Sequence, residues 1–184
     1  MKLVPIFART KHTLLAIQFE DEVVDEFTKA FRQWNDIAYL RSFFKTHEND
    51  LIDGFYTWPD SQTAVFHTLT LAQELEDLVF DKANGRADEI SDMLQDIFKP
   101  LNNVELNVRE LQKSKTSKQW LRLYAIRISR QCYVITGSAI KLVKLMNERE
   151  HLKKELHKLE RVKQYLIEIG LLDEWDVEFL ELKR

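Results

Sequence analysis

Strand-like apolar runs lie at both ends of this sequence, separated by a long stretch of helical periodicity, and this order limits the folds that the chain can adopt. Two short runs near the N-terminus, Lys2 to Ala8 and Thr13 to Phe19, have strand character. Helical spacing of apolar residues then continues as far as Phe98. Because an isolated two-stranded hairpin is marginally stable, the N-terminal strands need partners from the distal part of the chain. The order therefore favours one α+β domain over residues 1–184, and two domains divided near Pro100 are the alternative.

Apolar periodicity and turn residues place the individual elements. One stripe at helical spacing extends from Gln62 to Phe80 and another from Glu150 to Ile169, where Gly170 ends it. A shorter helix is expected from Ala87 to Phe98, and Asp36 is expected to cap the helix that follows it. Three distal strands are expected: Trp120 to Ser129, Gln131 to Thr136, and Ile140 to Met146 after a turn at Gly137 and Ser138. We therefore expect a small antiparallel sheet, made of the N-terminal hairpin and three distal strands, packed with several helices.

The formal net charge of −3 conceals opposite charges in the two halves of the chain. Residues 1–98 carry a net charge of −9, and residues 99–184 carry a net charge of +6. Between Lys113 and Lys163 the net charge reaches +10, and a field of that sign attracts a polyanion or an acidic protein surface. The acidic runs FEDEVVDEF and QELEDLVFD are most simply solvated helix faces. The alternative is that they lie beside the basic segment and partly neutralise it.

Cations and aromatic residues from neighbouring distal elements form a candidate binding platform. Lys154, Lys158 and Arg161 recur on one side of the closing helix. The strands add further cations: Arg122, Arg127, Arg130, Lys141 and Lys144. Trp120, Tyr124 and Tyr133 are interleaved with them, and RNA-binding proteins stack bases on such rings. The alternatives are a solvated surface for the cations and core packing for the rings.

Four short motifs follow one another in the distal half: LYAIRI at 123–128, YVI at 133–135, IKLV at 140–143 and ERE at 148–150. Together they resemble the RelE/ParE/HigB-like toxins of bacterial toxin-antitoxin systems, whose ribonuclease members carry four basic residues in these motifs. Arg127 and Arg149 match two of those basic positions, whereas Ala125 and Val134 stand at the other two. The resemblance covers roughly residues 101–169, and the toxin-like order of strand, two helices, three strands and helix fits this chain if its helical region is enlarged.

The resemblance implies an RNA-binding protein that cleaves mRNA as a metal-independent endoribonuclease. In that chemistry a ribose 2′-hydroxyl attacks the adjacent phosphate, and arginines stabilise the charge that develops. Arg127 and Arg149 would hold the scissile phosphate, with assistance from nearby basic side chains. The expected RNA-binding residues are Arg122, Tyr124, Lys141, Lys144, His151, Lys154, Lys158 and Arg161. The resemblance also implies RNA or the ribosome, and an antitoxin, as partners.

A second function stays open because Ala125 and Val134 depart from the ribonuclease pattern. It is a non-catalytic interaction module that binds an acidic protein partner or self-associates. No metal or cofactor is expected, since the sequence has no glycine-rich phosphate loop, nucleophile elbow or cluster of His, Cys and carboxylates at ligand spacing. Cys132 is expected to be a buried structural thiol. We expect a cytoplasmic protein without a membrane partner, since no apolar run is long enough to span a bilayer and no secretory signal is apparent.

Overall fold

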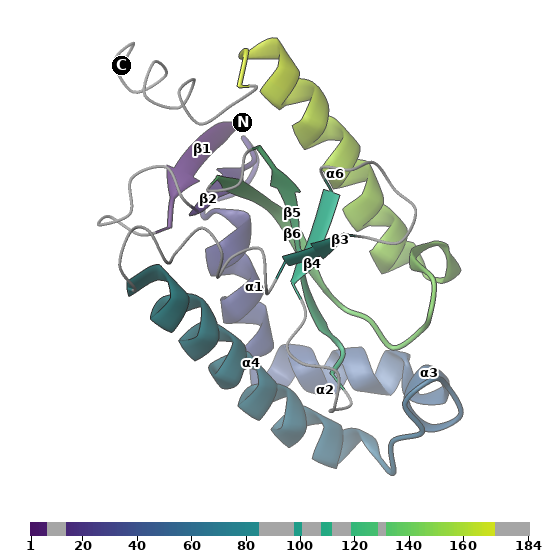
Figure 1. Ribbon diagram of the computed structural model, residues 1–184. Helices are drawn as coiled ribbons and strands as arrows, with labels where there is room; N and C mark the ends of the chain where they lie inside the picture. Colours follow the sequence, from purple (N-terminus) through teal and green to yellow (C-terminus); the bar gives the residue numbers. More distant parts are fainter. Residues whose placement is uncertain (7–13, 85–97, 101–107, 112–118, 129–131, 172–184) are drawn as a thin grey trace.

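The computed structural model describes residues 1–6, 14–84, 98–100, 108–111, 119–128 and 132–171. The chain begins with a hairpin in which β1 (Lys2–Pro5) pairs antiparallel with β2 (Leu14–Gln18). Figure 1 shows this hairpin beside the longer distal strands. There β2 pairs with β6 (Tyr133–Ile140), so the expected union of the N-terminal hairpin with the distal strands is confirmed.

One sheet contains all of the described strands, in the order β1-β2-β6-β5-β4-β3. Its remaining members are β3 (Phe98–Pro100), β4 (Val108–Leu111) and β5 (Leu121–Arg127). The expected α+β class with a small sheet is confirmed, but the expectation of a wholly antiparallel sheet is wrong because β2 and β6 are parallel. Parallel neighbours need a long crossover, and the helices and strands between residues 18 and 133 provide it.

The distal strands differ from the sequence-based expectation at two places. The predicted turn at Gly137 and Ser138 lies inside β6, which continues to Ile140 beyond a register shift opposite Tyr124 and Ala125. The predicted third strand from Ile140 to Met146 does not form, because the chain leaves the sheet after Ile140 and reaches a short 3₁₀ helix, η1 (Met146–Glu148).

Two short strands were not predicted at all. β3 and β4 have three and four residues, which is too short for apolar alternation to distinguish them from a loop. Phe98 begins β3 and so does not end a helix, and the rest of the helix expected from Ala87 lies outside the described residues. Arg130, Ser129 and the expected connection at 113–118 also lie outside them.

Helices account for most of the chain between β2 and β3. They are α1 (Glu26–Trp34), α2 (Ile37–Thr46), α3 (Glu48–Ile52) and α4 (Ser61–Asn84). The Asp36 carboxylate accepts hydrogen bonds from the Ala38 and Tyr39 amides, which confirms the predicted cap. After η1, α6 (Glu150–Glu168) ends before Gly170, whose φ of 73° is the left-handed conformation that terminates helices.

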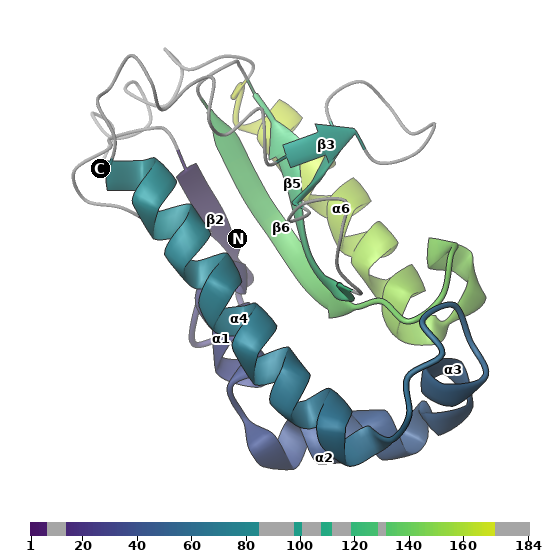
Figure 2. The ribbon, with the colours of Figure 1, turned by 60° about the horizontal axis from the view of Figure 1, so that its bottom comes forward.

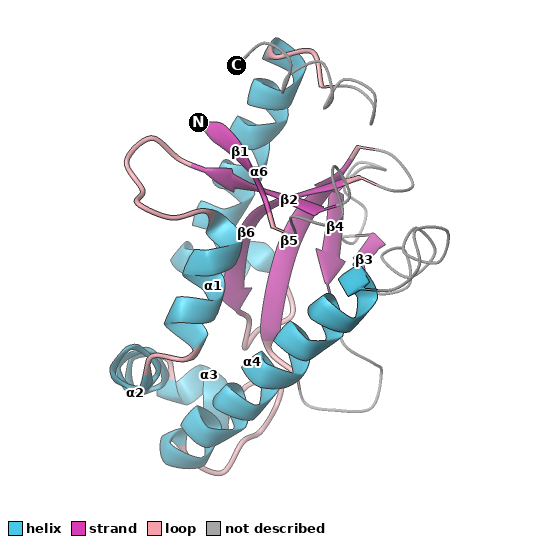
Figure 3. Cartoon of the chain, turned by 90° about the vertical axis from the view of Figure 1, so that its left-hand side faces the viewer, coloured by secondary structure: helices cyan, strands magenta, loops and turns pink. Residues whose placement is uncertain are grey.

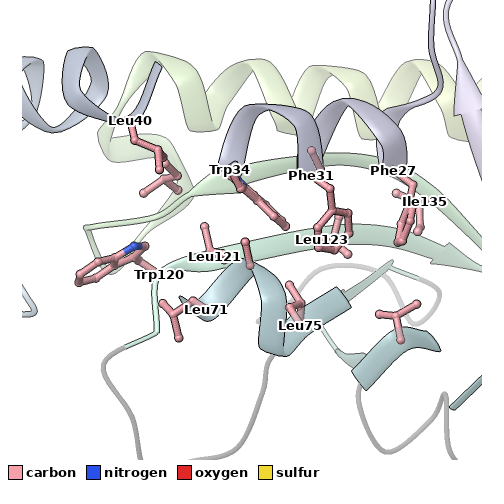
Figure 4. Packing of buried hydrophobic residues seen from close by; sticks show 14 of the residues in the cluster. Phe27, Phe31, Trp34, Leu40, Leu71, Leu75, Trp120, Leu121, Leu123 and Ile135 are labelled. Atoms are coloured by element: carbon pink, nitrogen blue, oxygen red, sulfur yellow. The ribbon is translucent and has the colours of Figure 1, made fainter. Parts of the chain in front are cut away.

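Helices cover both faces of the sheet, and alternate strand residues point to opposite sides. On one face α1 and α4 pack over Leu123 and Ile135, as Figure 4 shows. Phe44 of α2 packs against Trp120, with ring centroids 5.7 Å apart. On the other face α6 packs over Tyr124 and Val134, in the same cluster as buried Cys132. Figure 3 shows the sheet between α4 and α6. Among the described helices, none has both the length and the apolar character needed to cross a bilayer.

Candidate functional site

Arg149 precedes α6, and its guanidinium is held by Asp50 of α3. Its Nε donates to Asp50 Oδ2 at 2.6 Å, and its Nη2 donates to Asp50 Oδ1. The same guanidinium donates through Nη1 to the Glu148 carbonyl at 2.7 Å. These contacts hold the pKa of Asp50 below its usual value, with a smaller contribution from His47, whose Nδ1 is 3.4 Å away. An acid from the first half of the chain therefore neutralises a cation predicted to bind phosphate.

His151 lies beside this pair on the first turn of α6. Its ring centroid is 4.7 Å from that of His47 and 5.4 Å from that of Phe43. Its Nε2 lies 3.1 Å from the Ile140 carbonyl oxygen. Burial lowers the pKa of His151, which favours the neutral imidazole near neutral pH. The ring packs between two helices, as a structural histidine does.

A hollow of about 710 Å³ adjoins the Arg149–Asp50 pair, and we call it the α3–η1 hollow. Its lining residues are Asn49, Asp50, Asp53, Gly54, Phe55, Val143, Lys144, Leu145, Glu148 and Arg149. Lys144 Nζ lies 5.6 Å from the centroid of the exposed Phe55 ring. Two of the predicted cations therefore meet here. The three carboxylates of the lining exceed them in number, so the hollow does not attract a polyanion by charge alone.

Arg127 and Arg149 lie at opposite ends of the β5–β6 hairpin. Arg127 pairs with Tyr133, whereas the start of α6 adjoins Ile140 at the other end. Six residue steps of β5 separate these ends, which is on the order of 20 Å. Because Arg149 is also directed to Asp50, the structure does not bring the two arginines together around one phosphate.

Three further predicted RNA-binding residues are wholly or partly enclosed by the fold. Tyr124 is fully buried and its hydroxyl donates to Met146 Sδ at 3.0 Å, so its ring cannot stack on a base. Lys141 is buried. Arg122 is half-buried and donates from Nη1 to the carbonyls of Gln119 and Leu121. Tyr124 and Tyr133 are both fully buried, so these rings pack in the core, as the alternative for the aromatic residues predicted.

Lys158 faces α1 and does not lie on the solvent face of α6. Its Nζ is 2.6 Å from Glu26 Oε2 and 2.8 Å from Glu155 Oε1. Glu155 Oε2 also accepts a hydrogen bond from the Ser138 amide of β6 at 3.0 Å. Burial raises the pKa of Glu155 to about 7, and the attraction of Lys158 only partly opposes this rise. We call Glu26, Glu155 and Lys158 the α1–α6 network.

The remaining predicted cations on α6, Lys154 and Arg161, are exposed. The Arg161 guanidinium carbon lies 5.2 Å from the centroid of the Phe19 ring. Glu26 belongs to the acidic run FEDEVVDEF and neutralises Lys158. This contact agrees with the alternative that the run lies beside the basic segment. The predicted basic platform is therefore divided among internal ion pairs, buried side chains and separate exposed cations.

A groove between α2 and α4 is lined by residues outside the predicted site. It has a volume of about 550 Å³ and is lined by Ile37, Arg41, Lys45, Glu48, Ser61, Gln62, Val65 and Phe66. Figure 2 shows α2 at the lower end of the molecule, beside the first turns of α4. The four-residue spacing of Ile37, Arg41 and Lys45 could have identified one wall, but not the facing residues of α4.

Within the described part of the chain, no group of three or more His, Cys, Asp or Glu side chains is arranged to hold a metal ion. No family model, curated protein or solved structure matches the chain.

Proposed function

We propose that the protein is a non-catalytic interaction module that binds another protein. The observation that supports this function best is the pairing of Arg149 and Lys158 with carboxylates of the chain's own first half. These are two of the cations that an RNA-cleaving protein of this pattern would use. Here they join elements of the fold to each other.

The free energy needed to break these ion pairs argues against a role of Arg149 and Lys158 in phosphate binding. Lys158 would have to leave Glu26 and Glu155, whose side chains are 3% and 10% exposed. Removing one partner of a buried ion pair costs about 3–5 kcal/mol when the remaining charge is uncompensated. The cost is smaller here, because Lys29 stays 3.6 Å from Glu26 and the pKa of Glu155 is raised to about 7. A phosphate would have to recover that free energy before it contributed any affinity.

Exposed apolar side chains support a protein partner. Phe55 and Leu145 are each 57% exposed at the α3–η1 hollow, and Ile37 and Phe66 are exposed at the α2–α4 groove. Apolar groups that gather in hollows with a charged rim are typical of protein interfaces. Scattered single apolar residues would not support the same conclusion.

Affinity capture tests the proposed function. The full chain is immobilised and exposed to cell lysate with and without nuclease, and its own mass is measured by light scattering. We expect a protein to be retained at stoichiometric amounts after nuclease treatment, or a discrete dimer in solution. Retention of RNA alone by a monomer would contradict the proposal.

The RelE-like RNA-binding function is a second candidate, and one contact favours it. Lys144 lies over the exposed Phe55 ring beside Arg149, and a cation next to an exposed aromatic ring can hold a single-stranded base and its phosphate. In this case Lys144→Ala and Phe55→Ala should each weaken binding of a single-stranded oligoribonucleotide. Lys2→Ala, which removes an exposed cation of β1, serves as the matched control.

A further inference from the structure

Two cations of α2 face the α2–α4 groove without carboxylate partners among the described residues. Arg41 and Lys45 are exposed, and neither takes part in an ion pair with any described side chain. Arg149 and Lys158, in contrast, are both paired internally. Arg41 and Lys45 can therefore pair with carboxylates of a partner without first breaking an ion pair with a described residue.

Apolar side chains of α2 and α4 line the same groove as these cations. Phe66 is 59% exposed and Ile37 is 45% exposed, although both line the same groove as buried Val65. Exposed side chains of this size in a hollow lose unfavourable contact with water when a partner covers them. The groove thus combines exposed apolar side chains with the two cations of α2.

We propose that the α2–α4 groove binds an acidic amphipathic helix of a partner protein. This inference rests on the proposed function and specifies the partner's chemistry. Apolar side chains of the helix pack against Phe66, Val65 and Ile37, and its carboxylates pair with Arg41 and Lys45. This is the helix-in-groove mode of recognition, in which anchors recur at three- and four-residue spacing.

The length of the α2 wall of the groove fits such a helix. Ile37 and Lys45 are eight residues apart on α2, which is about 12 Å along its axis or slightly more than two turns. Two turns of a partner helix present apolar anchors at positions i, i+3 or i+4, and i+7. Carboxylates beside these anchors would follow the same wall as Arg41 and Lys45.

Glu48 is the acidic residue of the groove lining. Its substitution tests the proposal through a predicted increase in affinity. Glu48 is exposed at the first residue of α3. Its charge opposes an acidic helix, so Glu48→Lys should raise the affinity for that helix. A substitution that misfolds the protein cannot produce such a gain.

Fluorescence anisotropy with two synthetic probes tests the groove. One probe is an amphipathic helical peptide with leucine anchors flanked by glutamates, and the other carries lysines in place of the glutamates. We expect the wild-type protein to prefer the glutamate peptide, Arg41→Glu/Lys45→Glu to weaken its binding roughly tenfold or more, and Glu48→Lys to strengthen it. Phe66→Ala should also weaken binding. Ile167→Ala on α6 removes a similarly exposed apolar side chain outside the groove and should not weaken it.

Lys2→Glu/Arg32→Glu is the charge-matched control, since it reverses two exposed cations that do not line the groove. Equal loss of binding in this control would overturn the proposal in favour of a net-charge effect. So would an absence of preference between the peptides, or displacement of the glutamate peptide by oligouridylate at the same affinity. A wild-type dimer that dissociates in Arg41→Glu/Lys45→Glu would assign the groove to a second copy of the chain and overturn the proposal as well.

Capture from lysate separates this inference from the proposed function. If Arg41→Glu/Lys45→Glu retains the same nuclease-resistant partner as the wild type, the groove assignment is wrong and the proposed function stands. If the wild-type protein retains no protein and forms no dimer, the proposed function itself fails. Loss of a defined partner only in the groove variants, with Glu48→Lys retaining more of it, supports both.

Discussion

A side chain at position 137 would occupy the space that the Glu155 carboxylate uses. A Cβ built on Gly137 overlaps Glu155 Oε2 and lies 3.2 Å from Lys158 Nζ. We therefore expect Gly137→Ala to lower the free energy of unfolding by about 1–3 kcal/mol, as other overpacked sites do. Urea denaturation measures the change.

A double-mutant cycle identifies the cause of that loss. In a Glu155→Ala background the overlapping carboxylate is absent, so Gly137→Ala should be less destabilising than in the wild type. An unchanged cost in both backgrounds would show that the destabilisation arises from the backbone of β6 and not from the contact with Glu155.

The raised pKa of Glu155 predicts a pH dependence of stability. The folded state raises this pKa from 4.5 to about 7, so the folded protein keeps a proton that the unfolded chain loses within this window. The free energy of unfolding therefore falls as the pH rises from about 4.5 to 7, by at most about 3 kcal/mol from this group. Urea denaturation at pH 5 and pH 8 should show a smaller fall in Glu155→Gln than in the wild type.

Over part of this pH range, His151 changes the free energy of unfolding in the opposite direction. Its pKa is lowered in the folded protein, so its contribution to stability is lost as the pH falls below the ordinary value of 6.5. The difference between the wild type and Glu155→Gln at each pH isolates the Glu155 contribution. Parallel stability profiles of the two proteins would contradict a raised Glu155 pKa.

At the scale of elements, Asp50 and Arg149 connect α3 to the start of α6. Asp50 is 9% exposed, so removal of Arg149 leaves its charge without the main groups that compensate for it. We expect Arg149→Ala to lower the Tm and to accelerate amide hydrogen exchange in α3, with little change in β1 and β2. Lys154→Ala, which removes an exposed cation of α6, is the matched control and should leave α3 protection unchanged. Unaltered exchange in α3 of Arg149→Ala would mean that the pair does not hold the two elements together.

The long helices and the N-terminal hairpin could be predicted from the sequence, whereas β3 and β4 could not. The apolar stripes of α4 and α6 extend over several turns, so their helices follow from periodicity, and the Asp36 cap follows from residue type. The segments that form β3 and β4 do not show a period of two that would identify them as strands. Gly137 and Ser138 look like a turn in the sequence. In the structure the glycine instead leaves room for the Glu155 carboxylate, and Glu155 lies 18 positions further along the chain, where a local pattern does not reveal it.

At the scale of the whole molecule, the fold intermixes the acidic and basic halves. Glu26 meets Lys158 at a separation of 132 residues, and Asp50 meets Arg149 at a separation of 99 residues. The sequence correctly identified an excess of cations between Lys113 and Lys163, but local patterns do not encode ion pairs over such separations. The expected shared site of Arg127 and Arg149 did not form for a related reason: the hairpin places their positions at opposite ends.

The salt dependence of RNA binding tests most directly whether these internal pairs leave the molecule with a phosphate-binding platform. The measurement is the affinity of a single-stranded oligoribonucleotide for the wild type and Arg149→Ala across a range of salt concentrations. The logarithm of affinity against the logarithm of salt has a slope of about −0.7 per phosphate neutralised on a single strand. We predict a slope shallower than about −2 that is the same in both proteins. A slope of about −4 or steeper that becomes shallower in Arg149→Ala would contradict this account.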